Sequence, residues 1–165
     1  MENRSTTALV ALRRILRATE LNSRVLARQS ELTTSQMLVL RHVAREGKAL
    51  PSAIARAVDL KQATVTVLVN KLQEAGLVTR RRDTEDRRRV WVEMTDAGRA
   101  TLARSPDLLQ SRFEREFDML QEWEKAAMIA TLERVASMLD ASEIEAAPVL
   151  DVGDLDRLIE EQAGG

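Results

Sequence analysis

Apolar residues recur at helical spacing near the start of the chain. Leu9, Leu12 and Leu16 lie three and four residues apart, and further apolar residues continue this stripe through the segment 5–29. The spacing predicts one long amphipathic helix. The helix is longer than a small domain needs to cover its own core, so we expect its apolar stripe to meet a second copy of the chain.

Three shorter helices are expected next. Thr34 or Ser35 can cap the first of them, which Gly47 ends, and a very short helix spans 53–58. The third, at 62–75, repeats apolar residues at i, i+3, i+4 and i+7, which predicts that one face is buried. Its opposite face carries short hydrogen-bonding side chains and one cation: Gln62, Ala63, Thr66, Asn70 and Lys71.

The pattern then changes to a period of two. Val90, Val92 and Met94 alternate with residues of the opposite face, which predicts a half-buried strand. The segment 77–82 can pair with this strand across the polar tip 83–86. We therefore expect a β-hairpin directly after the helix with the polar face.

Helical spacing resumes after the hairpin, at Thr95 or Asp96. Pro106 is expected to break or bend the segment that follows. The last helix carries a second apolar stripe, which we expect to join the N-terminal stripe in a dimer interface. This second stripe includes Met128, Leu132 and Val135.

These elements predict a mainly α fold with a small β-wing. We expect an N-terminal dimerisation helix at 1–30, a winged helix-turn-helix domain at 31–98, C-terminal dimerisation helices at 99–140 and an acidic tail at 141–165. Such a fold places one long helix before the winged domain and others after it.

The residue composition excludes several kinds of metal site and covalent bond. The 165 residues include no Cys and one His, His42, which excludes disulfides, thiolate metal sites and multi-histidine metal sites. The sequence has no Gly-rich phosphate loop and no convergent acid–base pair, so we expect neither an enzyme nor a cofactor. It also lacks a signal-peptide pattern and an apolar run of membrane-spanning length, so we expect a cytoplasmic protein without a membrane partner.

Charge is unevenly distributed along the chain. The net charge is −1, but the segment from Asp140 onward holds eight acidic residues and one Arg and sums to −7. The preceding residues therefore carry +6, and a stretch of 80–89, RRRDTEDRRR, holds six of the arginines. A basic body is compatible with a polyanionic partner. The acidic tail is typical of a solvated chain end, with a DNA mimic or a dimer clasp as alternatives.

The order of the elements favours DNA binding. A helix with a hydrogen-bonding face fits the major groove of B-DNA, and an arginine-rich hairpin beside it can reach phosphates or the adjacent minor groove. The arginine run alone is as typical of a solvated surface as of DNA contact, and the polar helix face alone is a weaker signal still. The hypothesis therefore depends on the order and proximity of the two features. The alternative is a winged-helix module that binds another protein.

Residues 33–98 resemble the MarR family of winged-helix regulators. The matching stretches are LTTSQMLVLRHV, PSAIARAVDLKQATVTVLVNKLQEAGLVTR and DTEDRRRVWVEMTDAG, and the resemblance extends to about residue 140. It implies a homodimeric repressor that binds a palindromic operator in double-stranded DNA. In that arrangement the helix at 62–75 enters the major groove and a wing arginine enters the minor groove.

The resemblance also assigns roles in the wing. Arg88 is then the residue that enters the groove, and Asp86 orients the wing arginines. Lys61 stands where such helices often have a Ser or Thr cap; it cannot cap the helix, but it can reach a phosphate. The expected DNA-binding residues are Lys61, Gln62, Ala63, Thr64, Thr66, Asn70, Lys71, Arg80, Asp86, Arg87, Arg88 and Arg89.

The two tryptophans are candidates for packing or binding, and the effector that would release the protein from DNA is considered with them. We expect Trp91 to pack on a neighbouring helix, with DNA contact as the alternative. Trp123 is expected to anchor the junction of the last two helices or to line a ligand cavity. The effector is either a small molecule near Trp123 or ionic strength itself, because DNA binding by arginines weakens as salt rises. The tail run APVLDVGDLDR resembles regulators of ectoine (compatible-solute) genes, which agrees with the ionic-strength alternative.

Overall fold

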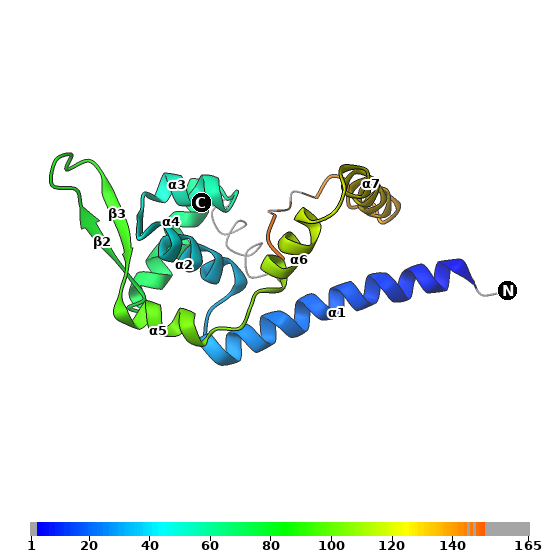
Figure 1. Ribbon diagram of the computed structural model, residues 1–165, viewed down its shortest axis with the longest axis horizontal. Helices are drawn as coiled ribbons and strands as arrows, with labels where there is room; N and C mark the ends of the chain where they lie inside the picture. The colour runs from blue at the N-terminus through cyan, green and yellow to red at the C-terminus, as the bar shows by residue number, and fades with distance from the viewer. Residues whose placement is uncertain (1–2, 145, 147, 151–165) are drawn as a thin grey trace. The chain divides into compact units, whose positions relative to one another are not determined.

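The computed structural model describes residues 3–144, 146 and 148–150 (Figure 1). It confirms the expected fold class, a mainly helical chain with one small sheet. No helix in this part of the chain is long and apolar enough to cross a membrane. The elements are α1 (Arg4–Ser30), α2 (Thr34–Glu46), β1 (Lys48–Ala49), α3 (Pro51–Ala57), α4 (Gln62–Glu74), β2 (Val78–Arg82), β3 (Val90–Met94), α5 (Asp96–Arg104), α6 (Leu109–Asp118) and α7 (Glu122–Met138).

The helices and strands form two compact units, one with α1 to α5 and the other with α6 and α7. The first unit extends to Pro106. It includes α5, which packs on α1 and α2. Its N-cap, Thr95, is bonded to the end of the α4–β2 turn: its hydroxyl donates to the carbonyl of Gly76 over 2.6 Å.

The three strands form an antiparallel sheet in the order β1-β3-β2. Strands β2 and β3 pair from Val78 opposite Met94 to Arg82 opposite Val90, so the expected hairpin is present. The short strand β1 pairs with the other edge of β3, with Lys48 opposite Glu93. Figure 1 shows this hairpin projecting beyond the helices of its own unit.

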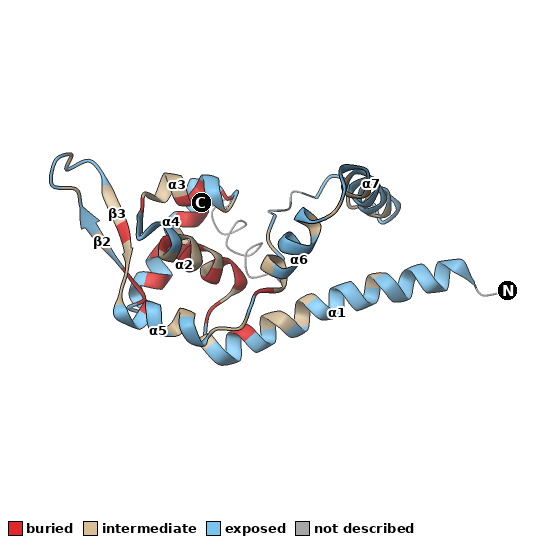
Figure 2. Cartoon of the chain, in the orientation of Figure 1, coloured by how far each residue is buried: buried red, intermediate tan, exposed pale blue. Residues whose placement is uncertain are grey.

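The core of this unit lies between α2, α3, α4 and the base of the hairpin (Figure 2). Burying each large aliphatic side chain here stabilises the fold by about 1.5–3 kcal/mol. The hairpin tip and most of α1 are exposed. The largest fully buried side chains include Leu26, Met37, Leu40, Ile54, Leu68, Leu72 and Val78.

The start of α2 differs from the sequence expectation. Its N-cap is Thr33, whose hydroxyl accepts a hydrogen bond from the backbone N–H of Gln36, while the Gln36 side chain accepts one from the N–H of Thr33. This reciprocal pair is a capping box. Thr34 and Ser35, the expected caps, lie inside the first turn and are buried. Pro106 stands between α5 and α6, as expected.

Both expected dimerisation stripes are largely exposed in the single chain. On α1, Leu9 and Leu16 are each 62% exposed and Leu12 is half-buried. On α7, Leu132 is 50% exposed. Met128 is also exposed and Val135 is half-buried. Aliphatic surface of this extent on two helices is typical of a surface that another chain covers.

Candidate nucleic-acid interface

Helix α4 buries one face and exposes the other. Val65, Leu68, Val69 and Leu72 are fully buried against the rest of the unit. This anchors the helix and leaves the polar face outward. The residues expected on that face are exposed: Gln62, Ala63, Thr66, Asn70 and Lys71, together with Lys61 at the N-cap.

Thr64 is a correction to the expected set. Its side chain is only 2% exposed, because Thr64 precedes Leu68 and Leu72 by one and two turns on the buried face. It therefore cannot meet a macromolecule with its side chain. Lys61 makes no capping hydrogen bond, as expected for a side chain without an acceptor.

The tip of the hairpin is built around Asp83. Its Oδ1 accepts hydrogen bonds from the backbone N–H groups of Glu85, at 2.8 Å, and Asp86, at 3.0 Å. Its own backbone N–H donates to the carbonyl of Arg89 over 2.9 Å, which closes the loop. Asp83 was missed by the sequence reasoning, although an Asp followed by polar residues at a hairpin tip is the usual signal for such a turn.

Asp86 contacts two of the wing arginines. Its Oδ1 accepts a hydrogen bond from the backbone N–H of Arg88 at 3.1 Å, and its Oδ2 lies 3.5 Å from Nε of Arg89. The guanidinium groups of Arg87 and Arg88 are exposed and have no ion-pair partner within the described residues. The tip therefore presents permanent positive charge on a backbone that carboxylates hold in shape.

Trp91 packs within the hairpin, not on a neighbouring helix as expected. Its indole Nε1 donates a 2.6 Å hydrogen bond to Oδ2 of Asp83, and Nζ of Lys48 lies 4.6 Å from the ring centroid. The indole bond, followed by the backbone donors of Asp86 and Glu85, lowers the pKa of Asp83 from 3.8 to about 2. Lys48 and Trp91 thus join two strands of the sheet to the tip.

Arg80 connects the hairpin to α4. From strand β2 its guanidinium donates to Oε1 of Gln73 at 2.8 Å and to Oδ1 of Asn70 at 2.6 Å. Sequence reasoning expected both Arg80 and Asn70 to face DNA independently. Their bond spans ten residues and ties the polar face of α4 to the arginine-rich hairpin.

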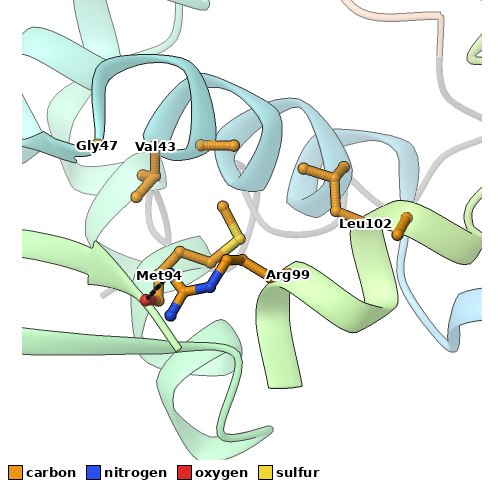
Figure 3. A pocket seen from close by; sticks show the side chains of 7 residues that line it. Val43, Gly47, Met94, Arg99 and Leu102 are labelled. Carbon is orange, nitrogen blue, oxygen red and sulfur yellow. Dashed lines mark hydrogen bonds between the residues drawn. The ribbon is translucent and has the colours of Figure 1, made fainter. Parts of the chain in front are cut away.

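A separate cavity of about 300 Å³ lies between α2, the end of β3 and α5 (Figure 3). Its charged member, Arg99, donates a hydrogen bond to the carbonyl of Met94 and pairs with Asp96. Trp123, which was expected to anchor a helix junction or to line a ligand cavity, is 72% exposed on α7. The remaining lining is apolar: Val43, Ala44, Gly47, Met94, Leu102 and Ala103.

The chain resembles known bacterial transcription regulators in sequence. The MarR family model matches residues 30–89. The HTH-type transcriptional regulator SarZ of Staphylococcus haemolyticus is 31% identical over 110 residues, which cover 67% of this chain and 74% of SarZ. The curated relatives found match over 40% to 75% of their own length. Two of them, YetL and MdtR of Bacillus subtilis, are named as repressors.

Solved structures share the fold. A probable transcriptional regulator from Pseudomonas aeruginosa is 25% identical with a TM-score of 0.51, over 73% of this chain and 93% of that one. A mutant of MarR from E. coli, solved in complex with operator DNA, is 21% identical with a TM-score of 0.50, over 78% and 95% of the two chains.

Proposed function

Because this chain belongs to the MarR family of transcriptional regulators, we propose that it represses transcription by binding a palindromic operator in double-stranded DNA as a homodimer. One observation carries the proposal: the exposed polar face of α4 and the arginine-rich hairpin are bonded together through Arg80 in one compact unit. The operator complex of the E. coli relative supports DNA as the partner, and the two repressors among the relatives support repression.

In this proposal α4 lies in the major groove. Gln62, Thr66 and Asn70 face base edges, with Ala63 close enough to contact a thymine methyl group. Lys61 and Lys71, at the two ends of the exposed face, neutralise phosphates.

The hairpin reaches the adjacent minor groove. Arg88 enters the groove, Arg87 and Arg89 flank it, and Asp86 keeps the backbone of Arg88 in position through its 3.1 Å bond. A guanidinium suits this groove because its planar donors match the acceptors on the groove floor and on phosphates.

The exposed stripes of α1 and α7 support the homodimer. Two-fold symmetry then places two copies of α4 on half-sites about 34 Å apart, so the operator is an inverted repeat. We propose that the stripes of α1 and α7 form the subunit interface and that neither contacts DNA.

We propose that rising ionic strength is the signal that releases the protein from its operator, because charge is unevenly distributed along the chain. Residues 1–139 carry +6 and the segment from Asp140 carries −7, so rising ionic strength weakens the arginine–phosphate contacts. The ectoine-like run at 147–157 lies mostly outside the described residues, and control of compatible-solute genes rests on that run alone. The other candidate is a small apolar molecule in the cavity beside Arg99.

Two experiments test these proposals. Selection from a pool of randomised duplexes by the full chain is expected to yield an inverted repeat, with affinity falling steeply between low and high salt. A chain that binds no duplex at low salt, yet captures a protein, would be a protein-binding module instead. Operator affinity in increasing potassium glutamate, for the full chain and for one ending at Asp140, tests ionic release. Specific binding that persists across the physiological range contradicts it.

A further inference from the structure

Arg80 controls the direction in which two amide side chains point. Asn70 and Gln73 lie three residues apart on α4, so both belong to one face of the helix. Both are exposed, and both direct their carbonyl oxygens to the same guanidinium. The bonded atoms are Nη2 of Arg80 with Oδ1 of Asn70, and Nη1 with Oε1 of Gln73.

The chemistry of the guanidinium makes this orientation unambiguous. Arg has five N–H donors and no acceptor, so an amide that faces it must present its oxygen and not its nitrogen. The charge strengthens both bonds. The NH2 groups of Asn70 and Gln73 consequently face away from Arg80, and neither makes a hydrogen bond within the described residues.

Thr66, one turn before Asn70, has the opposite polarity. Its hydroxyl proton is donated to the backbone carbonyl of Gln62 over 2.9 Å. Only the oxygen lone pairs of Thr66 remain for an external partner. The exposed face of α4 thus offers acceptors at Thr66 and donors at Asn70.

We propose that Arg80 is a positioning residue that fixes Asn70 as a donor, so that Asn70 is a specificity-determining residue for hydrogen-bond acceptors on DNA. Acceptors of this kind are N7 and O6 of guanine, N7 of adenine, O4 of thymine and the phosphate oxygens, but in adenine the N6 donor lies beside N7 and opposes a second amide donor. The paired contact to N6 and N7 of adenine, which Asn otherwise makes, needs the amide oxygen that Arg80 occupies. The inference rests on the proposed function, because it concerns how α4 reads its operator.

The test compares sequence preference, not affinity alone. The full chain and its variants are each presented with a pool of randomised duplexes and then with single duplexes that differ at one position. Asn70→Asp keeps an oxygen for Arg80 but removes the donors. Repulsion between the new carboxylate and the DNA phosphates weakens binding to all sequences alike, so it cancels in the ratio of affinities, and Asn70→Ala tests the same loss without a charge.

Asn70→Asp and Asn70→Ala are expected to lose discrimination at one position of each half-site, about tenfold or more. The base preferred there by the unsubstituted chain is expected to be guanine or thymine. Arg80→Met frees the amide and is expected to shift the preference at that position towards adenine. Arg80→Lys, with a single charged nitrogen in place of the fork, is expected to restore the original preference in part. Unchanged thermal unfolding shows that the variants fold.

The outcomes separate the sources of the acceptor. A loss confined to one position identifies a base edge. A uniform loss with the uncharged Asn70→Ala variant identifies a phosphate, and either result supports donation by Asn70. An adenine preference at that position which Arg80→Met leaves unchanged overturns the inference, as does an Asn70→Asp variant with unaltered affinity and preference. If the unsubstituted chain selects no sequence, the proposed function itself fails.

Discussion

The indole of Trp91 and the carboxylate of Asp83 meet in a 2.6 Å hydrogen bond at the tip of the β2–β3 hairpin. Strand pairing sets Trp91 opposite Arg81, two residues before Asp83, so the indole reaches forward to the tip. The other oxygen of Asp83 holds two backbone N–H groups of the loop. One ionised side chain therefore determines the shape of the loop that carries Arg88.

This arrangement predicts a pH dependence for the hairpin. The hydrogen bonds lower the pKa of Asp83 from 3.8 to about 2, so they contribute fully above pH 3.8 and are lost as the pH falls towards 2. In a Trp123→Phe background, Trp91 is the sole tryptophan. Its fluorescence is expected to stay constant from neutral pH to about pH 4 and to change below it. Asp83→Asn should alter it already at neutral pH, whereas Glu85→Gln should not. A transition near neutral pH would contradict the assignment.

Arg88→Ala is expected to weaken binding to the selected operator and to reduce the slope of log affinity against log salt by about one. The reason is the loss of one exposed guanidinium that has no ion-pair partner among the described residues. Arg104→Ala, which removes an equal charge from the end of α5, is the matched control and should change little. Equal effects of the two substitutions would indicate net charge and not a wing contact. Fluorescence anisotropy over a salt series measures both.

Gln62→Ala and Lys71→Ala should separate base reading from phosphate binding. Gln62 is at the start of the exposed face of α4 and is expected to contact a base edge, which contributes about 1–3 kcal/mol of discrimination. Lys71 is expected to contact a phosphate, so its loss should weaken all duplexes alike. Affinities for the operator and for a scrambled duplex give the ratio that distinguishes the two. A changed ratio for Lys71→Ala alone would reverse the assignments.

Gly98→Ala is expected to destabilise the chain by about 3 kcal/mol. A Cβ at this position would overlap the backbone carbonyl oxygen of Leu77 and lie 2.7 Å from Cγ of Met94. Gly76→Ala is the control, because its Cβ meets nothing within 4 Å although φ is +72°, and about 1 kcal/mol is expected there. Denaturant unfolding measures both. If the two variants lost similar stability, the backbone around Gly98 would be able to move away from Leu77 and Met94 with little loss of free energy.

Leu16→Glu and Leu132→Glu are each expected to convert a dimer to a monomer. Leu16 and Leu132 are each at least half exposed in the single chain. Each substitution places a charge in an apolar stripe, and the burial of an unpaired charge opposes association. Ala18→Glu lies about half a turn from the α1 stripe and should leave the dimer intact. Sedimentation at micromolar concentration distinguishes them. An unsubstituted chain that sediments as a monomer, with and without operator DNA, would overturn the dimer.

The sequence predicted elements whose signal is local. The apolar spacing of α4 and the alternation of β3 each identify their element, because the burial of one face imposes a period on a single segment. Thr64 was misassigned although its spacing to Leu68 and Leu72 indicates the buried face. The hydroxyl of a threonine suits either face of a helix, and Thr64 lies between Ala63 and Thr66, which are both exposed.

Other contacts could not be predicted because they join separate segments. The bonds from Arg80 to Asn70 and from Trp91 to Asp83 depend on the pairing register of β2 and β3 and on the packing of α4 against β2. Periodicity tells which side of a strand a residue occupies, but not which side chain it meets there. The cap at Thr33 depends on an extended backbone, φ −78° and ψ 165°, which Thr34 and Ser35 could equally have adopted by sequence alone.

The hydrogen bonds of Thr95 connect α4, the hairpin and α5. Its backbone N–H donates to the carbonyl of Leu77 and its hydroxyl donates to that of Gly76, while the hydroxyl oxygen also accepts from the N–H of Gly98. Thr95 thus joins by hydrogen bonds the turn after α4, the residue before β2 and the first turn of α5. These bonds couple the position of α5 to those of α4 and the hairpin. In the proposed dimer, a displacement of α5 would therefore be expected to move α4 and the hairpin of one subunit relative to those of the other, and so to change the distance between the two proposed DNA-binding surfaces.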